Sequence, residues 1–208
     1  MARKRYGRTA GKLVLGVVLA IIAYLGLQYS AMLNGMDLAA GQYSQGDIEG
    51  ALATYENVES RIRTHGALRI IPTRDRHNLF LNQARLLYAM KEYDEAAEKL
   101  EKEDEITGTA TDGRFFLLRG EIGFRKAITN YQQSAKKDVS LLEENLLAAE
   151  DSLRESLRLS PSDWDAKYNY EFVSNVRKSL ASSGQEKVKL LEEEEKPQTK
   201  ELPPELAG

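Results

Sequence analysis

Few residues in this chain are suited to catalysis. It contains no cysteine, so it has no disulfide framework, thiolate metal site or cysteine nucleophile. Its two histidines, His65 and His77, are twelve residues apart without a set of carboxylate partners, and we expect no metal site there. The segment Gly7–Leu13, GRTAGKL, resembles a phosphate-binding loop, but it is one residue short between its glycines and follows no predicted strand.

Other catalytic signatures are also missing from the sequence. There is no nucleophile elbow, and the aspartates and glutamates occur in helix and loop patterns that are typical of surface charge. We therefore expect a protein that is not an enzyme, with no cofactor and no small-molecule substrate.

The charge is distributed unevenly along the chain. The net charge is −3, and residues 1–12 contribute +5 through five basic residues without an acid, so the remaining 196 residues carry −8. An acidic chain of this kind lacks the basic surface of a nucleic-acid-binding protein, and no nucleic-acid partner is expected. The length of 208 residues favours one domain with appendages.

The first predicted structural element is an apolar stretch near the amino terminus. Leu13–Leu27 reads LVLGVVLAIIAYLGL, and its continuation to Leu33 gives about 20 residues, enough to cross a bilayer as a helix. The alternative is a cleaved secretory signal, but Tyr29 stands where a cleavage site needs a small residue. We therefore expect a transmembrane helix over residues 13–33.

The orientation of this span follows from its flanking charges. The basic segment 1–12 precedes the span, and the next basic residue is Arg61. Because positive flanks stay inside, the amino terminus is expected in the cytoplasm and the remainder outside it. In a bacterium, this predicts a single-pass inner-membrane protein with its carboxyl-terminal domain in the periplasm.

The part after the span has helical periodicity and no convincing alternation of period two. Over Val139–Leu159, the apolar residues form a single stripe that is typical of an amphipathic helix: Leu142, Leu146, Ala149, Leu153 and Leu157. The predicted fold class is all-α, with one helical domain over residues 34–182 and a disordered acidic tail over 183–208 that contains Glu192–Glu195.

An internal repeat is visible within the helical part. GDIEGALATY, Gly46–Tyr55, aligns with KEYDEAAEKL, Lys91–Leu100, and a degraded third copy surrounds Ala149. The alanines Ala51, Ala96 and Ala149 are expected where paired helices cross closely. Their separations of 45 and 53 residues exceed the ~34 residues of a tetratricopeptide repeat, and two long inserted segments account for the excess.

The last helix is expected to begin in the segment Ser160–Asp163, with Ser160 as the N-cap and Pro161 as the first helical residue. Its apolar residues follow at intervals of four, and the helix is expected to cover the open end of the repeat stack. These residues are Trp164, Tyr168, Phe172, Val176 and Leu180.

The two aligned segments resemble tetratricopeptide repeats, which are helix-pair solenoids that bind peptides or partner proteins. The stretch Leu157–Val173, LRLSPSDWDAKYNYEFV, is similar to small membrane-anchored tetratricopeptide proteins encoded beside MoxR-type AAA+ ATPases and von Willebrand A-domain proteins, including the MxaK type. The resemblance implies a short solenoid with a capping helix, and partners from such a MoxR and von Willebrand A-domain system. The third repeat departs from the pattern because it lacks an obvious Gly-Asp turn.

Candidate binding residues follow from this architecture. In helix-pair arrays the first helix of each pair lines a groove, and for the clearest repeat that helix is expected over His77–Met90. Asn78, Asn82, Arg85 and Tyr88 are the residues expected to face the groove, where amide and guanidinium groups can bind an extended peptide or its carboxylate. The alternative is ordinary polar surface.

A second candidate surface is a loop predicted over Arg61–His77, with basic residues suited to acidic headgroups or an acidic partner, or simply solvated. These residues are Arg61, Arg63, Arg69, Arg74 and Arg76. On the last helix, Asn169 and Glu171 are two residues apart and cannot share a face. One of them is therefore expected to bond a neighbouring helix while the other meets solvent.

The sequence thus predicts a membrane-anchored scaffold or assembly factor whose partners are other proteins. Two alternatives remain open. The chain could be a translocon-associated periplasmic chaperone helper, or an envelope lipid-binding structural protein that acts through its basic loop.

Overall fold

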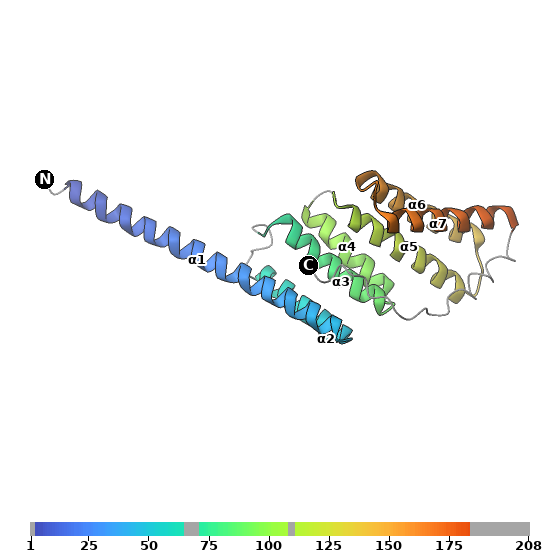
Figure 1. Ribbon diagram of the computed structural model, residues 1–208, viewed down its shortest axis with the longest axis horizontal. Helices are drawn as coiled ribbons and strands as arrows, with labels where there is room; N and C mark the ends of the chain where they lie inside the picture. The colour runs from blue at the N-terminus through green and yellow to red at the C-terminus, as the bar shows by residue number, and fades with distance from the viewer. Residues whose placement is uncertain (1–2, 65–70, 108–110, 184–208) are drawn as a thin grey trace. The chain divides into compact units, whose positions relative to one another are not determined.

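The computed structural model describes residues 3–64, 71–107 and 111–183, and within these ranges all regular structure is helical (Figure 1). The prediction of an all-α chain is confirmed for this part. The helices are α1 (Arg3–Ser44), α2 (Ile48–Thr64), α3 (Thr73–Ala89), α4 (Tyr93–Thr107), α5 (Gly113–Gln133), α6 (Val139–Leu159) and α7 (Trp164–Ser183). They belong to two compact units, residues 1–72 and residues 73–208.

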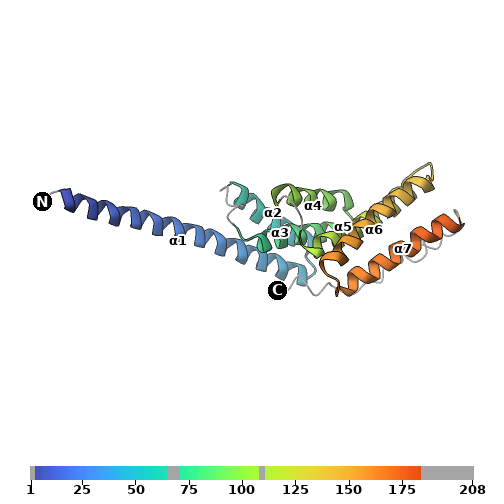
Figure 2. The same cartoon turned by 90° about the horizontal axis from the view of Figure 1, so that it is seen from above.

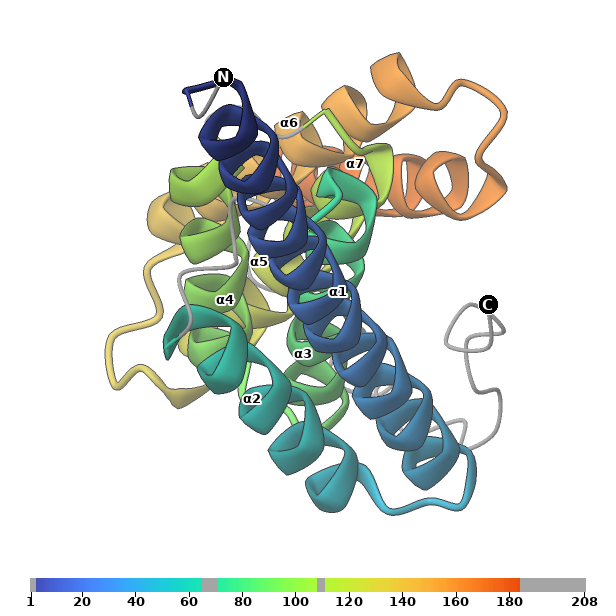
Figure 3. The same ribbon diagram turned by 90° about the vertical axis from the view of Figure 1, so that its left-hand side faces the viewer.

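The first unit consists of α1 and α2, which pack against each other (Figure 3). α1 is long and apolar enough to cross a membrane, with a mean hydropathy of 2.0 over its most apolar window. Its residues from Gly11 to Tyr24 are all exposed. The predicted limit between span and domain, at residues 33 and 34, lies inside this continuous helix.

The turn between α1 and α2 contains the start of the first aligned repeat segment, Gly46–Tyr55. Gly46 has a φ of 86°, and the amides of Gly46 and Asp47 donate to the carbonyls of Tyr43 and Gln42. This is the Schellman arrangement that ends a helix at a left-handed residue. The carboxylate of Asp47 then accepts from the amide of Gly50 at 2.9 Å and caps the start of α2.

The aligned segment after α3 has the same turn. Lys91, which aligns with Gly46, also has a positive φ, 66°, and the amides of Lys91 and Glu92 donate to the carbonyls of Tyr88 and Leu87. The sequence match therefore corresponds to the same local structure in both units. A lysine in this conformation is uncommon, because its Cβ crowds the backbone.

The second unit consists of α3 to α7, in which each helix packs on the next (Figure 2). In addition, α5 contacts both α3 and α7. As a result α3, α5 and α7 form one row, while α4 and α6 lie against pairs of helices from that row.

The tightest packing in this unit joins α5 to α6. A Cβ at Gly120 would lie 2.5 Å from the Cγ of Leu153 and 3.1 Å from the carbonyl oxygen of Ala149. A Cβ at Gly123 would meet the Cβ of Ala149 at 3.4 Å. Gly120 and Ala149 thus let two helices approach closely, which confirms the crossing role predicted for Ala149.

The predicted helix over Val139–Leu159 is confirmed as α6, and four of its five stripe residues are buried. They join residues from α5 and α7 in one apolar core, whose buried members are Phe124, Ala127, Ile128, Tyr131, Leu142, Leu146, Ala149, Leu153, Val173, Val176 and Leu180.

The prediction for the start of the last helix is wrong. α7 begins at Trp164, and Asp163 is its capping residue, because its carboxylate accepts from the amide of Ala166 at 3.1 Å. Ser160 instead ends α6, and its amide donates to the carbonyl of Ser156. Both residues are favoured at N-caps, and the sequence pattern did not distinguish between them.

The predicted apolar stripe of α7 is only half correct. Val176 and Leu180 are buried, but Trp164 is 77% exposed and Tyr168 is 71% exposed. Residues four apart advance by about 400° on a helix, so a stripe of strict period four rotates by about 40° at each step. The stripe is therefore exposed at Trp164 and Tyr168 and reaches the buried face at Val176 and Leu180.

Candidate functional site

A polar cluster lies where α3, α5 and α7 form their row, and we call it the central cluster. It comprises Arg85 and Tyr88 of α3, Glu121 and Arg125 of α5, and Asn169 of α7, all half-buried. The Nε of Arg125 donates to the Tyr88 hydroxyl at 3.3 Å, and the Nδ2 of Asn169 donates to Glu121 Oε1 at 2.7 Å. Side chains from three helices that are not consecutive in the chain therefore meet on one face.

Glu121 is the electrostatic centre of this cluster. Its burial raises the pKa of the carboxyl group from 4.5 to about 7, although the charge of Arg85 and the hydrogen bond from Asn169 act in the opposite direction. Asp165 on α7 adds to the increase through its negative charge. Glu121 therefore changes its charge near neutral pH, and the balance of charge on this face changes with it.

Tyr88 stays protonated in this environment. Burial raises the pKa of its hydroxyl, and the neighbouring Arg125 only partly offsets this effect. A protonated Tyr88 accepts the bond from Arg125 and keeps an O–H donor. The central cluster thus presents two guanidinium groups, a phenol, an amide and the carboxyl group of Glu121 on the same face.

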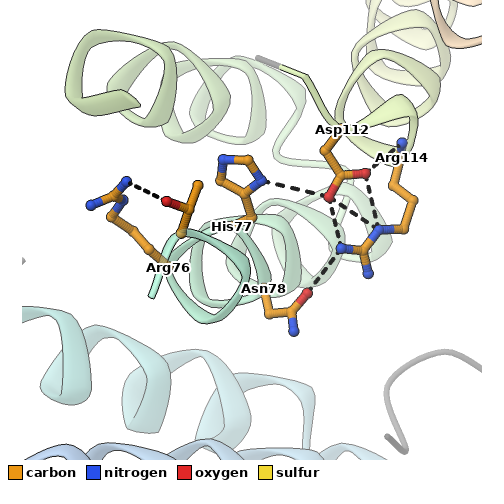
Figure 4. Close-up of polar contacts among 6 residues, drawn as sticks. Arg76, His77, Asn78, Asp112 and Arg114 are labelled. Atoms are coloured by element: carbon orange, nitrogen blue, oxygen red, sulfur yellow. Dashed lines mark hydrogen bonds and ion pairs between the residues drawn. The ribbon is translucent and has the colours of Figure 1, made fainter. Parts of the chain in front are cut away.

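A second cluster, which we call the helix-start cluster, joins the amino-terminal ends of α3 and α5 (Figure 4). Asp112 accepts from the amide of Arg114 at 3.0 Å and so caps α5, and the guanidinium of Arg114 pairs with the same carboxylate at 2.7 Å. Arg114 also donates to Asn78 Oδ1 at 3.1 Å, and His77 Nδ1 lies 3.6 Å from Asp112. This network holds α3 against α5.

The protonation states in the helix-start cluster follow from burial and charge. Burial lowers the pKa of His77, although Asp112 partly offsets it, so the imidazole is neutral at pH 7. Burial would raise the pKa of Asp112, but the hydrogen bonds and positive charge of Arg114 outweigh it and lower that pKa. The cluster is thus a carboxylate–guanidinium pair beside a neutral imidazole, which suits a structural connection.

An aromatic ladder runs from the core to the surface next to the central cluster. Phe124 is buried and meets Phe172 edge to face with ring centroids 5.4 Å apart, and Phe172 stacks on exposed Tyr168 at 6.4 Å. One turn earlier, exposed Trp164 carries Lys167 above its ring at 4.8 Å. Exposed aromatic residues on a packed base are typical anchors at protein interfaces.

The four predicted groove residues all lie on α3 and are half-buried: Asn78, Asn82, Arg85 and Tyr88. Asn78 belongs to the helix-start cluster, and Arg85 and Tyr88 belong to the central cluster. Sequence reasoning missed Glu121 and Arg125 on α5, because it did not assign the residues of the long segment before α6 to the faces of a helix. The GEIGFRK stretch around Gly120 contained the signal, since the glycine that permits the close crossing fixes which face Glu121 and Arg125 occupy.

The prediction for Asn169 and Glu171 is confirmed. Asn169 bonds Glu121 on α5, while Glu171 is exposed to solvent.

The prediction of a basic loop over Arg61–His77 is wrong at both of its ends, which lie in helices. Arg61 and Arg63 lie in the last turn of α2, and Arg74 and Arg76 lie in the first turn of α3. Arg76 is buried, and Arg63 pairs with Glu59 at 2.7 Å. Helix formation extends further on both sides because arginine has a high helix propensity. Arg61 and Arg63 are also favoured by the dipole at the carboxyl-terminal end of α2.

Two predicted residues, Arg69 and His65, lie outside the described residues, as does the predicted acidic tail. Within the described ranges, no three histidine, aspartate or glutamate side chains are placed to hold a metal ion. Neither a scan against protein-family models nor a search of curated proteins finds a match to this chain.

Proposed function

We propose that this chain is a membrane-anchored scaffold that binds another protein through the row of α3, α5 and α7. In this proposal α1 crosses a bacterial inner membrane with its amino terminus in the cytoplasm, and the second unit is a tetratricopeptide-like helix-pair solenoid in the periplasm. The basic segment 1–12 and the apolar stretch of α1 support the orientation.

The observation that carries the proposal is the composition of one face. The central cluster and the aromatic ladder combine polar groups of three helices with exposed rings of Trp164 and Tyr168. Tryptophan, tyrosine and arginine are the residues that dominate binding energy at protein interfaces. Both aromatic side chains are largely exposed to water, and a partner that covers them gains from their burial.

The chemistry of this face favours a peptide with a carboxylate. Arg85 and Arg125 offer guanidinium groups that can bind a carboxylate at two points, and Tyr88 adds a hydroxyl donor. Apolar side chains of the same peptide would cover Tyr168 and Trp164. A short extended segment or a carboxyl terminus of a partner protein fits this combination.

The likeness of Leu157–Val173 to tetratricopeptide proteins encoded with MoxR ATPases supports a more specific proposal. The partner would be a von Willebrand A-domain or MoxR-type protein, and the scaffold would serve envelope-protein maturation or metalloenzyme activation. This partner class is an analogy that rests on sequence resemblance rather than on the contacts of the face.

Cross-linking in native membranes, followed by purification through a carboxyl-terminal tag, tests this proposal. A dedicated scaffold yields one or a few abundant partners, and the variants Trp164→Ala and Tyr168→Ala reduce their recovery. The matched control is Leu141→Ala, which removes an exposed apolar side chain from α6. Recovery of translocon subunits with a broad spread of secreted chains would contradict the scaffold and favour the chaperone helper.

A further inference from the structure

An apolar cavity of about 640 Å³ lies within the first unit, between the second half of α1 and α2. Its volume falls within the range of ~300–1,000 Å³ that is usual for small-molecule sites. The α1 wall extends from Leu25 to Leu38, and the α2 wall extends from Ala53 to Ile62. This cavity belongs to neither cluster of the second unit.

The cavity begins where the apolar stretch of α1 ends. A crossing that starts at Leu13 uses about 20 helical residues, so the wall from Leu25 onward covers the last part of the span and continues beyond it. Tyr29, which lines the cavity, is a residue type that concentrates at the membrane–water boundary. Lipid chains in the bilayer thus have direct access to the cavity along α1.

The charge of the lining indicates which amphiphile fits. Of the sixteen lining residues, only Arg61 carries a formal charge, and the remainder are apolar or neutral. Arg61 lies on α2 at the exposed carboxyl-terminal end of that helix. An apolar chain would occupy the walls, while a negatively charged head group would lie near the guanidinium.

The two walls meet where the side chain of Val58 packs directly against Gly35. A Cβ at Gly35 would lie 2.5 Å from Cγ2 of Val58, so α1 and α2 are in close contact at this point. Gln28, Thr54 and Asn57 supply neutral polar groups elsewhere in the lining.

We propose that this cavity binds one acyl chain of an anionic membrane phospholipid, with the lipid phosphate held by Arg61. The site would fix the position of α2 at the membrane surface. This inference rests on α1 crossing the membrane, which is part of the proposed function.

The test uses the full chain in lipid nanodiscs that contain phosphatidylglycerol with a photoactivatable group near the end of one acyl chain. After irradiation, mass spectrometry maps the residues that carry lipid. We expect labelling on α2 between Ala53 and Ile62, in addition to labelling on the span. Labelling confined to residues 13–27 of α1 would overturn the proposal.

Three variants distinguish lipid binding in this cavity from general attraction of the protein to an anionic membrane surface. Ala53→Trp places a large side chain in the cavity from an exposed position and should abolish labelling of α2. Arg61→Gln should lower it about fivefold, the effect expected for one basic residue at an anionic surface. Arg63→Gln is the control, because it removes the same charge two residues away and outside the cavity, and should change labelling less than twofold.

If Arg61→Gln and Arg63→Gln reduce the labelling of α2 equally, the role of Arg61 is overturned. If the labelling of α2 is unchanged in Ala53→Trp, the cavity is not the site. The same probe built on phosphatidylcholine should label α2 more weakly, whereas equal labelling would contradict the anionic head group.

Extraction of the membranes with alkaline carbonate distinguishes failure of the proposed membrane anchoring from failure of the lipid site. If the chain is released, anchoring by α1 fails; if it stays while labels avoid α2, only the lipid site fails.

Discussion

The close crossing of α5 and α6 predicts opposite effects for alanine at two glycines one turn apart. At Gly120 a new Cβ would lie 2.5 Å from Cγ of fully buried Leu153 and 3.1 Å from the carbonyl oxygen of Ala149, which cannot move without moving α6. At Gly123 the nearest atom would be 3.4 Å away, within reach of ordinary contact after a small adjustment. Both changes gain the helix preference of alanine, about 1 kcal/mol.

Because this gain is common to both variants, their difference isolates the clash. Overpacking a close-packed core costs about 1–3 kcal/mol, so Gly120→Ala should be less stable than Gly123→Ala by about 2 kcal/mol. The assay is hydrogen exchange of α5 and α6 peptides across a urea series, which reports on the second unit without contribution from the first.

A double variant provides the internal check. Combining Gly120→Ala with Leu153→Ala removes the crowded side chain, so the double variant should lose less than the sum of the two single losses by more than about 0.5 kcal/mol. If Gly120→Ala is as stable as Gly123→Ala, the close approach of α5 and α6 at Gly120 is refuted.

Three further perturbations test the polar interactions of the second unit. Because the pKa of Glu121 is raised from 4.5 to about 7, the free energy of unfolding is highest below pH 4.5 and falls as the pH rises to about 7. Glu121→Gln should remove this loss, so that its free energy of unfolding in urea exceeds that of the wild type by about 3 kcal/mol at pH 8 but not at pH 4. Arg177→Met leaves the buried carboxylate of Glu150 without its 2.7 Å partner and should cost roughly 3 kcal/mol, whereas Arg154→Met removes an exposed partner at 3.4 Å and should cost under about 1 kcal/mol. Asp163→Ala removes the cap of α7 and should cost about 1 kcal/mol, measured as faster amide exchange in the first turn of that helix.

Local patterns in the sequence predicted several elements correctly because their causes are local. The stripe over Val139–Leu159 defined α6 to the residue. The alignment of Gly46 with Lys91 identified two turns with the same hydrogen bonds, although only one has a glycine. Helix periodicity and turn chemistry depend on neighbours within a few residues, and the sequence contains those neighbours.

The features that sequence reasoning missed depend on contacts between distant segments. Glu121 and Asn169 are 48 residues apart and meet only because α5 and α7 pack together. The exposure of Trp164 likewise depends on which face of α7 the core covers, and hydrophobicity alone placed that ring inside. The cavity between α1 and α2 depends on how the two helices pack against each other, which the sequence of neither segment specifies by itself.

We propose above that a protein partner occupies the face formed by α3, α5 and α7. The most direct measurement places a photo-cross-linking amino acid at Tyr168, and separately at Leu141 on α6, in the full chain in native membranes. If a partner binds this face, position 168 yields a discrete cross-linked protein that position 141 does not, and Arg125→Ala weakens this cross-link. Equal cross-linking from both positions, or none from position 168, would contradict the claim.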